Sequence, residues 1–281
     1  MSQKLVILGH SGFLGQFLYR NFLKDPHYEV CGFSSSQFDL SASDSSSKLT
    51  DIVDDALLIM AASALVKNKD FDFFSKDISM FINLANPELI SKIKHLIYIS
   101  SIAIYGRHSD LSITETSPAN FNSFYSLAKF IGELIFKQVC AGCGTGLTIL
   151  RPGIFYGHGD VRSPLFRFIN NVRMGKEIEM YGDESSRLFW IHKKDLFRII
   201  GSVISDFKLG DYNVVSEDDG TSLSDLAEAV FNLCGRRTGT KFIPSRTSPT
   251  NIRFDTSKFK TSFPGFQFID FKDGIKEYLI P

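Results

Sequence analysis

A tyrosine and a lysine at helical spacing are the side chains in this sequence best suited to proton chemistry. Tyr125 and Lys129 enclose the run Tyr-Ser-Leu-Ala-Lys. Residues at i and i+4 share one face of a helix, so the ammonium would lie near the phenol. A nearby positive charge favours the phenolate and lowers the pKa of a tyrosine. Such a phenol can exchange a proton near neutral pH, although this spacing also occurs on ordinary solvated helix faces.

Two serines end a predicted buried strand over residues 95–100. The segment over residues 100–106 reads Ser-Ser-Ile-Ala-Ile-Tyr-Gly and directly follows the apolar part of that strand. Open α/β sheets bind ligands outside the carboxyl ends of their strands. The hydroxyls of Ser100 and Ser101 are therefore candidates for contact with a substrate, and a simple turn is the other interpretation.

A glycine triplet follows the first apolar run of the chain. Gly9, Gly12 and Gly15 stand between the tetrad over residues 5–8 and a run with helical periodicity. The spacing G-x-x-G-x-x-G is one residue longer in its first gap than the dinucleotide fingerprint. In a strand–turn–helix context, glycines let the backbone approach a pyrophosphate at a helix N-terminus. The segment predicts a dinucleotide site, and a plain turn is the alternative.

The elements that must position these residues alternate between strands and helices. The apolar patterns predict helices starting at residue 13 and over 71–84 and 124–139, with loops over 34–36 and 41–47. The predicted strands cover residues 5–8, 29–33, 56–61, 95–100 and 147–151. This alternation predicts an α/β fold with a doubly wound parallel Rossmann sheet.

The pattern changes after Gly157 to a smaller, mixed α+β half. Helices are expected over 164–174, 195–204 and 223–234, an extended segment over 187–191 and a strand over 212–215. We therefore expect a dinucleotide-binding domain over residues 1–157, with 188–215 returning to it. Residues 158–187 and 216–281 are expected to form a substrate-binding domain.

Composition excludes several classes of protein. The 281 residues include 31 Lys and Arg and 31 Asp and Glu, so no basic surplus points to nucleic acid. A hydrophobic content of 43% excludes global disorder. Cys140 and Cys143 have C-x-x-C spacing in an expected loop, but no second ligand pair accompanies them, so we expect reduced thiols and no metal. The apolar runs are too short for a signal segment or a membrane span, which predicts a soluble, cytoplasmic protein.

Taken in order, these motifs resemble the extended short-chain dehydrogenase/reductases, and more narrowly the NAD-dependent epimerase/dehydratase family that acts on nucleotide sugars. Three later segments extend the resemblance. Residues 150–157 read Leu-Arg-Pro-Gly-Ile-Phe-Tyr-Gly, similar to the family's L-R-P-x-x-x-Y-G. Residues 187–195 are similar to its R-D-F-x-H-V-x-D, and residues 212–216 to its Y-N-V-G-S.

The resemblance implies a role for each matching residue. Tyr125 would be the catalytic acid/base, Lys129 would bond the nicotinamide ribose, and Ser101 would be the third catalytic hydroxyl. Ser101 and Tyr125 would also contact the substrate, whose diphosphate Arg187 would hold. The residues that the resemblance assigns to the cofactor, besides Tyr125 and Lys129, are Gly9, Ser11, Gly12, Phe13, Leu14, Gly15, Ser34, Ser35, Asp39, Leu40, Ala61, Ala62, Ser63 and Pro152.

Departures from the family pattern bear on the cofactor and the reaction. Residues 33–36, Phe-Ser-Ser-Ser, lack the acid that bonds the ribose 2′-hydroxyl in NAD-binding members, which favours NADP. They also lack a Lys or Arg for a 2′-phosphate, which leaves NAD as the alternative. Asp77 stands where many members have Asn, and Ile102-Ala103 replaces the acid pair of the dehydratases.

The expected function is reduction of the keto group, at C4, of a nucleotide-diphosphate-linked deoxysugar by NADPH, in polysaccharide biosynthesis. An NAD-dependent epimerase is the first alternative, because it would use the same three side chains. A catalytically silent NADP-binding protein is the second alternative. The expected partner is a nucleotide-diphosphate sugar, without nucleic acid or membrane, and a homodimer is possible.

Overall fold

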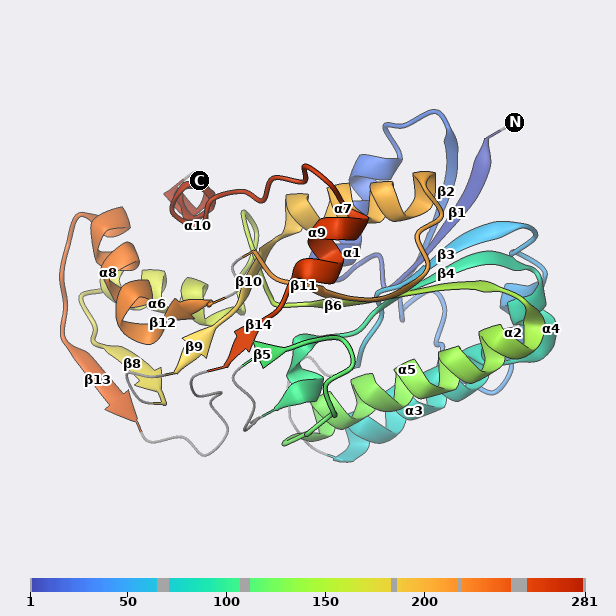
Figure 1. Cartoon of the computed structure of the whole chain (residues 1–281), viewed down its shortest axis with the longest axis horizontal. Coiled ribbons are helices and arrows are strands. Elements are labelled where there is room, and N and C mark those ends of the chain that lie inside the picture. The colour runs from blue at the N-terminus through green and yellow to red at the C-terminus, as the bar shows by residue number, and fades with distance from the viewer. Residues whose placement is uncertain are drawn as a thin grey trace. The chain divides into compact units, whose positions relative to one another are not determined.

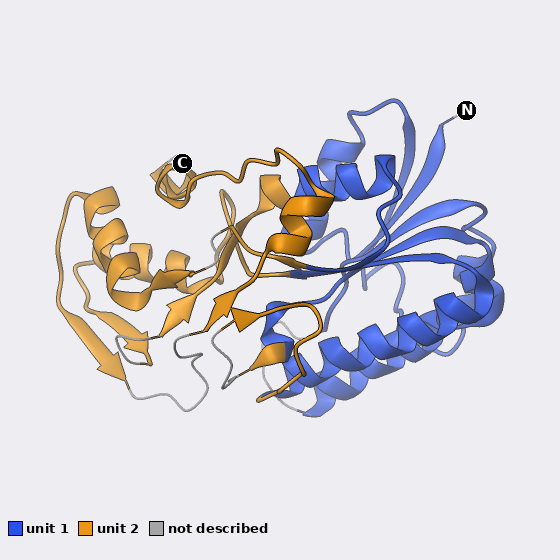
Figure 2. Ribbon diagram, viewed as in Figure 1, with its two compact units in different colours: residues 1–104, 123–151, 197–212 blue, residues 105–122, 152–196, 213–281 orange. Residues whose placement is uncertain are grey.

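The computed structural model describes residues 2–64, 71–106, 112–182, 186–216, 219–243 and 252–279. The chain divides into two compact units (Figure 2). Unit 1 contains residues 1–104, 123–151 and 197–212, and unit 2 contains residues 105–122, 152–196 and 213–281. The binding roles that the sequence analysis gave to the two parts of the chain remain predictions.

Unit 1 is built on a parallel sheet of six strands in the order β11-β6-β4-β3-β1-β2 (Figure 1). Leu5, Val6, Ile7 and Leu8 of β1 are all fully buried, as expected for a strand covered on both faces. The sheet confirms the predicted doubly wound fold. Its strands are β1 (Gln3–Leu8), β2 (Tyr28–Phe33), β3 (Ala56–Met60), β4 (Ile93–Ile99), β6 (Gly146–Pro152) and β11 (Gly210–Val214).

Helices cover both faces of this sheet (Figure 1). On one face α1 (Phe13–Phe22) packs against α7 (Lys193–Ser205), with the Phe22 and Phe197 rings 4.8 Å apart. The other face carries α2 (Ser45–Thr50), α3 (Phe71–Leu84), α4 (Pro87–Ser91) and α5 (Phe124–Cys143). Phe81 of α3 and Phe136 of α5 pack with Tyr98 of β4 in the core of the unit. The rigid layer of sheet and helices fixes where each strand end and each helical side chain lies.

Helix α2 corrects the loop predicted over residues 41–47, because residues 45–47 are helical. Serine is a weak helix former, so the local sequence favoured a loop. Burial of Leu49 in the core and an ion pair of 2.6 Å between Lys48 and Asp44 favour the helix instead. The Ser45 hydroxyl also donates to the carbonyl of Leu40.

Helix α5 is longer than predicted and includes both cysteines of the C-x-x-C pair. Ser123 caps its start through a reciprocal hydrogen-bonding pair with Ser126, and it ends at Gly144, whose φ of 71° is left-handed. Cys140 and Cys143 therefore lie in the last turn of the helix, and the prediction of a loop there is wrong. Both are free thiols. Within the described ranges, no cluster of His, Cys, Asp and Glu could hold a metal ion.

Unit 2 is a mixture of short strand pairs and helices, as expected for the second half. β7 (Ile154–Tyr156) pairs with β10 (Trp190–His192), and β9 (Arg187–Leu188) pairs with β12 (Thr221–Ser222). β8 (Ile178–Tyr181) pairs with β13 (Thr240–Ile243), and β5 (Ser112–Ile113) pairs with β14 (Arg253–Phe254). The helices are α6 (Pro164–Arg173), α8 (Leu223–Cys234), α9 (Ser257–Ser262), α10 (Phe271–Gly274) and the 3₁₀ turn η2 (Ile275–Leu279); a further 3₁₀ turn, η1 (Ile102–Tyr105), follows β4.

The single extended segment predicted over residues 187–191 is in fact two strands. The chain changes pairing partner at Phe189, whose carbonyl accepts a hydrogen bond from Ile154. No helix in the described part of the chain is both long enough and apolar enough to cross a membrane.

Candidate functional site

The turn after β1 requires glycine at two of the three predicted positions. Gly9 has a φ of +87°, and a Cβ there would lie 2.7 Å from the Cα of Ala62. A Cβ on Gly15 would lie 2.1 Å from the carbonyl oxygen of Gly9. The Gly9 amide donates to Phe33 at the end of β2. The turn is therefore pressed against the ends of β2 and β3, as a dinucleotide cradle at a sheet edge requires.

The segment after β2 places the predicted ribose contacts beside this turn. The Ser34 hydroxyl is buried and donates to Gln37 at 3.0 Å, whereas Ser35 is exposed. Asp39 is exposed and accepts hydrogen bonds from the amide and hydroxyl of Ser41, while Leu40 packs into the core. The residues at this edge fit a dinucleotide, and Ser35 is the predicted serine contact whose side chain is exposed to solvent. Lys76 of α3, whose ammonium lies 3.7 Å from Asp39, is a cation near this segment that the sequence analysis missed.

The three predicted catalytic residues all belong to unit 1 and meet at the carboxyl end of β4. Ser101 lies just beyond β4, and its hydroxyl is hydrogen-bonded with the phenol of Tyr125 on α5. Lys129, one turn further along α5, is buried. Its Nζ donates to the carbonyl of Ile99 at 2.9 Å and lies 6.0 Å from the centre of the Tyr125 ring.

Burial controls the pKa values of this group. It raises the pKa of Tyr125, and the charge of Asp77 raises it further, against the hydrogen bond from Ser101 that lowers it. Burial lowers the pKa of Lys129, while Asp77 and Glu133 oppose that effect. The predicted lowering of the Tyr125 pKa is therefore wrong in this structure: burial outweighs the other influences, and Lys129 is hydrogen-bonded to Ile99. Tyr125 is a protonated phenol at neutral pH.

Asp77 ties the segment after β3 to α3. Its fully buried carboxylate accepts hydrogen bonds from the Ser63 hydroxyl at 2.9 Å and the Ala64 amide at 2.6 Å. Burial raises the pKa of Asp77, and the charge of Lys129 is the largest influence that opposes it. Both carboxylate oxygens thus hold the segment that contains three predicted cofactor residues, Ala61, Ala62 and Ser63. The family position of Asp77 was readable from the sequence, but these partners were not.

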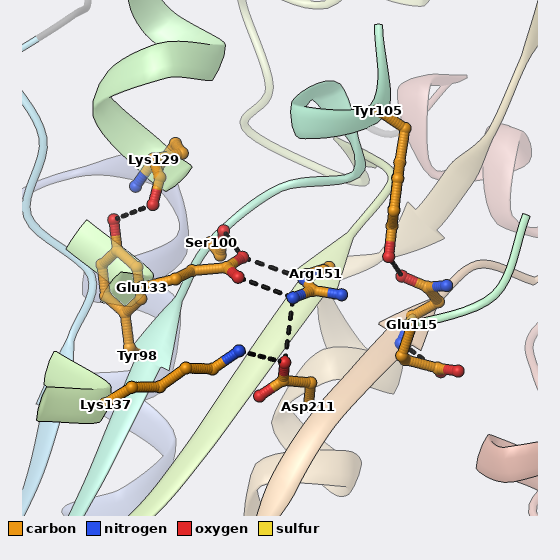
Figure 3. Close-up of polar contacts among 10 residues, drawn as sticks. Tyr98, Ser100, Tyr105, Glu115, Lys129, Glu133, Lys137, Arg151 and Asp211 are labelled. Carbon is orange, nitrogen blue, oxygen red and sulfur yellow. Dashed lines mark hydrogen bonds and ion pairs between the residues drawn. The ribbon is translucent and has the colours of Figure 1, made fainter. Parts of the chain in front are cut away.

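A buried network of charged side chains next to the predicted catalytic group was missed entirely (Figure 3). The carboxylate of Glu133 on α5 is fully buried and accepts hydrogen bonds from Ser100 at 2.5 Å and from Arg151 at 2.9 and 2.6 Å. Arg151 also pairs with Asp211 at 2.9 Å, and Lys137 reaches the same carboxylate. The only sequence signal was the position of Glu133, four residues after Lys129.

The predicted residues of unit 2 have well-defined local surroundings. Pro152 is buried at the end of β6. Arg187 is half-buried on β9, opposite Ser222 in the backbone pairing of β9 with β12. Arg187 follows two acidic residues in the sequence, Asp183 and Glu184, which lie outside the described residues.

Three further side chains of unit 2, those of Glu115, Tyr105 and His192, have polar contacts within the unit. The Glu115 carboxylate accepts a hydrogen bond from the backbone amide of Asn213 at 2.8 Å. The Tyr105 hydroxyl donates to the side-chain oxygen of the same Asn213 (Figure 3). His192 is fully buried, and its Nε2 lies 3.3 Å from the carboxylate of Glu277.

The glycine turn, the Ser–Tyr–Lys group and the Rossmann sheet together define the class of protein. Residues 5–215 match the NAD dependent epimerase/dehydratase family, and the chain belongs to that family.

The curated relatives align with the chain over only part of their length. The chain is 30% identical over 127 residues to a dTDP-4-dehydro-6-deoxy-D-allose reductase of Streptomyces bikiniensis, which covers 43% of this chain and 39% of the relative. The curated relatives that the chain matches are covered over 39% to 62% of their own length.

Solved structures share the fold at lower identity. A UDP-glucuronic acid 4-epimerase from Bacillus cereus, in complex with UDP-glucuronic acid and NAD, aligns with a TM-score of 0.83 at 20% identity, over 98% of this chain and 97% of that one. A GDP-mannoheptose C4 reductase from Campylobacter jejuni with NADP bound aligns with a TM-score of 0.82 at 19% identity, over 99% and 98%.

Proposed function

We propose that this protein is an NADP-dependent reductase of the C4 keto group of a nucleotide-diphosphate-linked deoxysugar. The observation that carries the proposal is the grouping of Ser101, Tyr125 and Lys129 at the end of β4, on the same sheet whose β1 leads into the glycine turn. A nicotinamide cofactor supplies the hydride for such a reduction when it is bound.

The side chains of this chain supply the proton and its environment. Reduction of a ketone adds hydride to carbon and a proton to oxygen, and leaves the cofactor oxidised. The protonated phenol of Tyr125 can donate that proton, while Ser101 can hydrogen-bond the same oxygen. The buried ammonium of Lys129 favours the phenolate that remains. The raised pKa keeps the Tyr125 phenol protonated at neutral pH, and a proton donor must hold its proton before the reaction.

The cofactor proposal depends on the segment after β2. No acid is present among residues 33–36 to repel a 2′-phosphate, and Ser35 is exposed there. The relative that reduces a 4-keto deoxysugar supports the same reaction class. Arg187 is proposed to hold the substrate diphosphate, because a guanidinium can bind two phosphate oxygens at once. A homodimer remains a prediction.

An NAD-dependent epimerase is the second candidate. The observation that favours it is the lack of any Lys or Arg among residues 33–36 to bind a 2′-phosphate. An epimerase would use the same Ser101, Tyr125 and Lys129.

The experiment is a panel of nucleotide 4-ketosugars and nucleotide 4-hydroxy sugars, each assayed with NADPH and with NADH, following absorbance at the nicotinamide band and identifying each product. Net oxidation of NADPH with formation of a 4-hydroxy sugar is the expected result. Interconversion of two 4-hydroxy sugars without net cofactor oxidation would establish the epimerase instead.

A further inference from the structure

The carboxyl end of β4 is held by two different kinds of contact. Directly after its last residue, Ile99, the backbone amide of Ser100 donates to the carbonyl of Leu150 in the neighbouring strand β6 at 2.8 Å. Downstream, the chain leaves the sheet and enters η1 at Ile102. Ser100 is flanked by Ile99, whose carbonyl accepts a hydrogen bond from the Lys129 ammonium, and by Ser101, which is hydrogen-bonded with Tyr125. The placement of both catalytic partners therefore depends on how firmly this short segment is fixed.

The Ser100 side chain supplies the second attachment. Its buried hydroxyl donates to Oε1 of Glu133 at 2.5 Å. Glu133 lies one helical turn after Lys129, so the same face of α5 presents the ammonium to Ile99 and the carboxylate to Ser100. Ile99, the last residue of β4, and Ser100, which follows it, are thus hydrogen-bonded to two neighbouring turns of α5.

Arg151 fixes the carboxylate that makes this attachment. Its Nε donates to Oε1 and its Nη2 donates to Oε2 of Glu133, a two-pronged geometry that allows a single orientation. Nη2 also pairs with Asp211, so the guanidinium is held from a second side (Figure 3). A buried ion pair is weak evidence for stability by itself, because desolvation offsets much of the attraction. Its geometry here points to positioning.

We propose that Glu133 is a positioning residue, which, clamped by Arg151, holds Ser100 and thereby sets Ile99 and Ser101 against Lys129 and Tyr125. This inference rests on the proposed function for the roles of Lys129 and Tyr125. In this proposal Glu133 touches neither substrate nor cofactor and positions the strand end through its hydrogen bond with Ser100. Its negative charge also opposes the lowering of the Lys129 pKa, an effect that Ser100→Ala leaves intact.

Two variants and one control test this positioning role. Ser100→Ala removes only the hydroxyl that transmits it. Glu133→Gln keeps the shape and one acceptor oxygen but places an amide N–H against Arg151. Lys137→Ala is the matched control, because Lys137 joins the network only through Asp211 and its side chain is 43% exposed.

Three measurements are made on each variant: the dissociation constant of NADPH by direct titration, kcat and KM per folded site, and the melting temperature. We expect Ser100→Ala and Glu133→Gln to weaken NADPH binding at least about fivefold and to lower kcat at least about tenfold, with KM for the ketosugar within about twofold. The double variant is expected to be no worse than Glu133→Gln alone, since both changes disrupt the same Ser100–Glu133 hydrogen bond and only Glu133→Gln also removes the charge near Lys129. Lys137→Ala should match wild type throughout.

A merely structural role predicts a different outcome. If the two variants lose melting temperature but keep the wild-type NADPH affinity and kcat per folded site, the positioning role is overturned. If wild-type protein binds NADPH but reduces no ketosugar, the proposed function is overturned, and the NADPH titrations still decide the inference about Glu133.

Discussion

The Nζ atom of Lys129 lies 6.0 Å from the centre of the Tyr125 ring and bonds the Ile99 carbonyl. The lysine thus lies beside the Tyr125 ring, while its hydrogen bond goes to the backbone of Ile99. Burial then dominates and raises the pKa of Tyr125. The pair is arranged as a protonated phenol beside a buried cation, which suits donation of a proton to a developing alkoxide.

Removal of the Tyr125 hydroxyl is the first prediction. Tyr125→Phe should lower kcat by roughly 10²- to 10⁴-fold, the usual contribution of a positioned general acid. The ring remains, so the NADPH dissociation constant should stay within a few-fold of wild type. Steady-state kinetics and a fluorescence titration measure the two quantities. A variant that keeps kcat within a few-fold of wild type would show that Tyr125 is not the acid.

The charge of Asp77 should be visible in the pH profile. Its carboxylate raises the pKa of Tyr125, so Asp77→Asn should lower that pKa. Because reduction needs the protonated phenol, activity is lost as the pH rises through the pKa of Tyr125. The alkaline limb of the kcat profile should therefore move to lower pH in the variant. A limb that stays in place, or moves to higher pH, contradicts the electrostatic role given to Asp77.

Arg187 should contribute to binding of the substrate and not to binding of the cofactor. Arg187→Ala should raise KM for the sugar nucleotide more than about tenfold, a loss of roughly 1.4 kcal/mol. NADPH affinity and melting temperature should stay close to wild type. If Arg187 instead only forms a surface ion pair, KM will not change, because the substrate is not contacted. The melting temperature will then fall slightly, since such pairs contribute at most about 1 kcal/mol of stability.

His95 should make the fold sensitive to acid. It is fully buried, and burial lowers its pKa to about 4. Its Nε2 donates to Thr148, because the Thr148 hydroxyl itself donates to the Lys208 carbonyl. Below a pH of about 6.5 the unfolded chain binds a proton that the folded protein excludes. Stability should therefore fall as the pH drops from about 6.5 towards 4, by on the order of 2 kcal/mol at pH 5.

Urea unfolding at pH 7 and at pH 5 measures this effect. His95→Gln should lose less stability on acidification than wild type, because glutamine stays neutral. His27→Gln is the matched control, since the His27 side chain is 85% exposed. Equal losses in wild type and in His95→Gln would rule out His95 as the source.

Preference for NADPH over NADH is the prediction for the cofactor. The exposed hydroxyl of Ser35 can bond a 2′-phosphate, and no acid among residues 33–36 repels it. Titration should give the lower dissociation constant for NADPH. Release of tightly bound NAD(H) when the purified protein is denatured would support the epimerase.

Periodicity predicted the sheet and most helices of the fold. α3 and α8 begin and end where the apolar spacing indicated, because tertiary packing acts on the same apolar stripe. The helix over 45–50 was missed because Leu49 is buried by residues distant in sequence. Gly144 was the available signal that α5 extends to Cys143, since a left-handed glycine commonly follows a helix end.

The candidate site divides in the same way. Ser101, Tyr125 and Lys129 were found because local spacing and strand ends place them. Glu133 and Arg151 are 18 residues apart on a helix and a strand, and their ion pair exists only once α5 packs on the sheet. The predicted direction of the Tyr125 pKa shift was wrong for a related reason: the sequence showed the nearby lysine but not the extent of burial.

Net reduction of a nucleotide ketosugar requires that a hydride pass from the cofactor to the sugar, and a labelled hydride makes this transfer visible. Wild-type protein is given NADPH with both hydrogens at C4 of the nicotinamide replaced by deuterium, together with the nucleotide 4-ketosugar turned over fastest in the panel, and the product is analysed by mass spectrometry and NMR. We expect one NADPH to be oxidised for each sugar converted, and we expect the deuterium to be found on C4 of the 4-hydroxy product. Sugar conversion without NADPH oxidation, or a product without deuterium at C4, would contradict the proposed reduction.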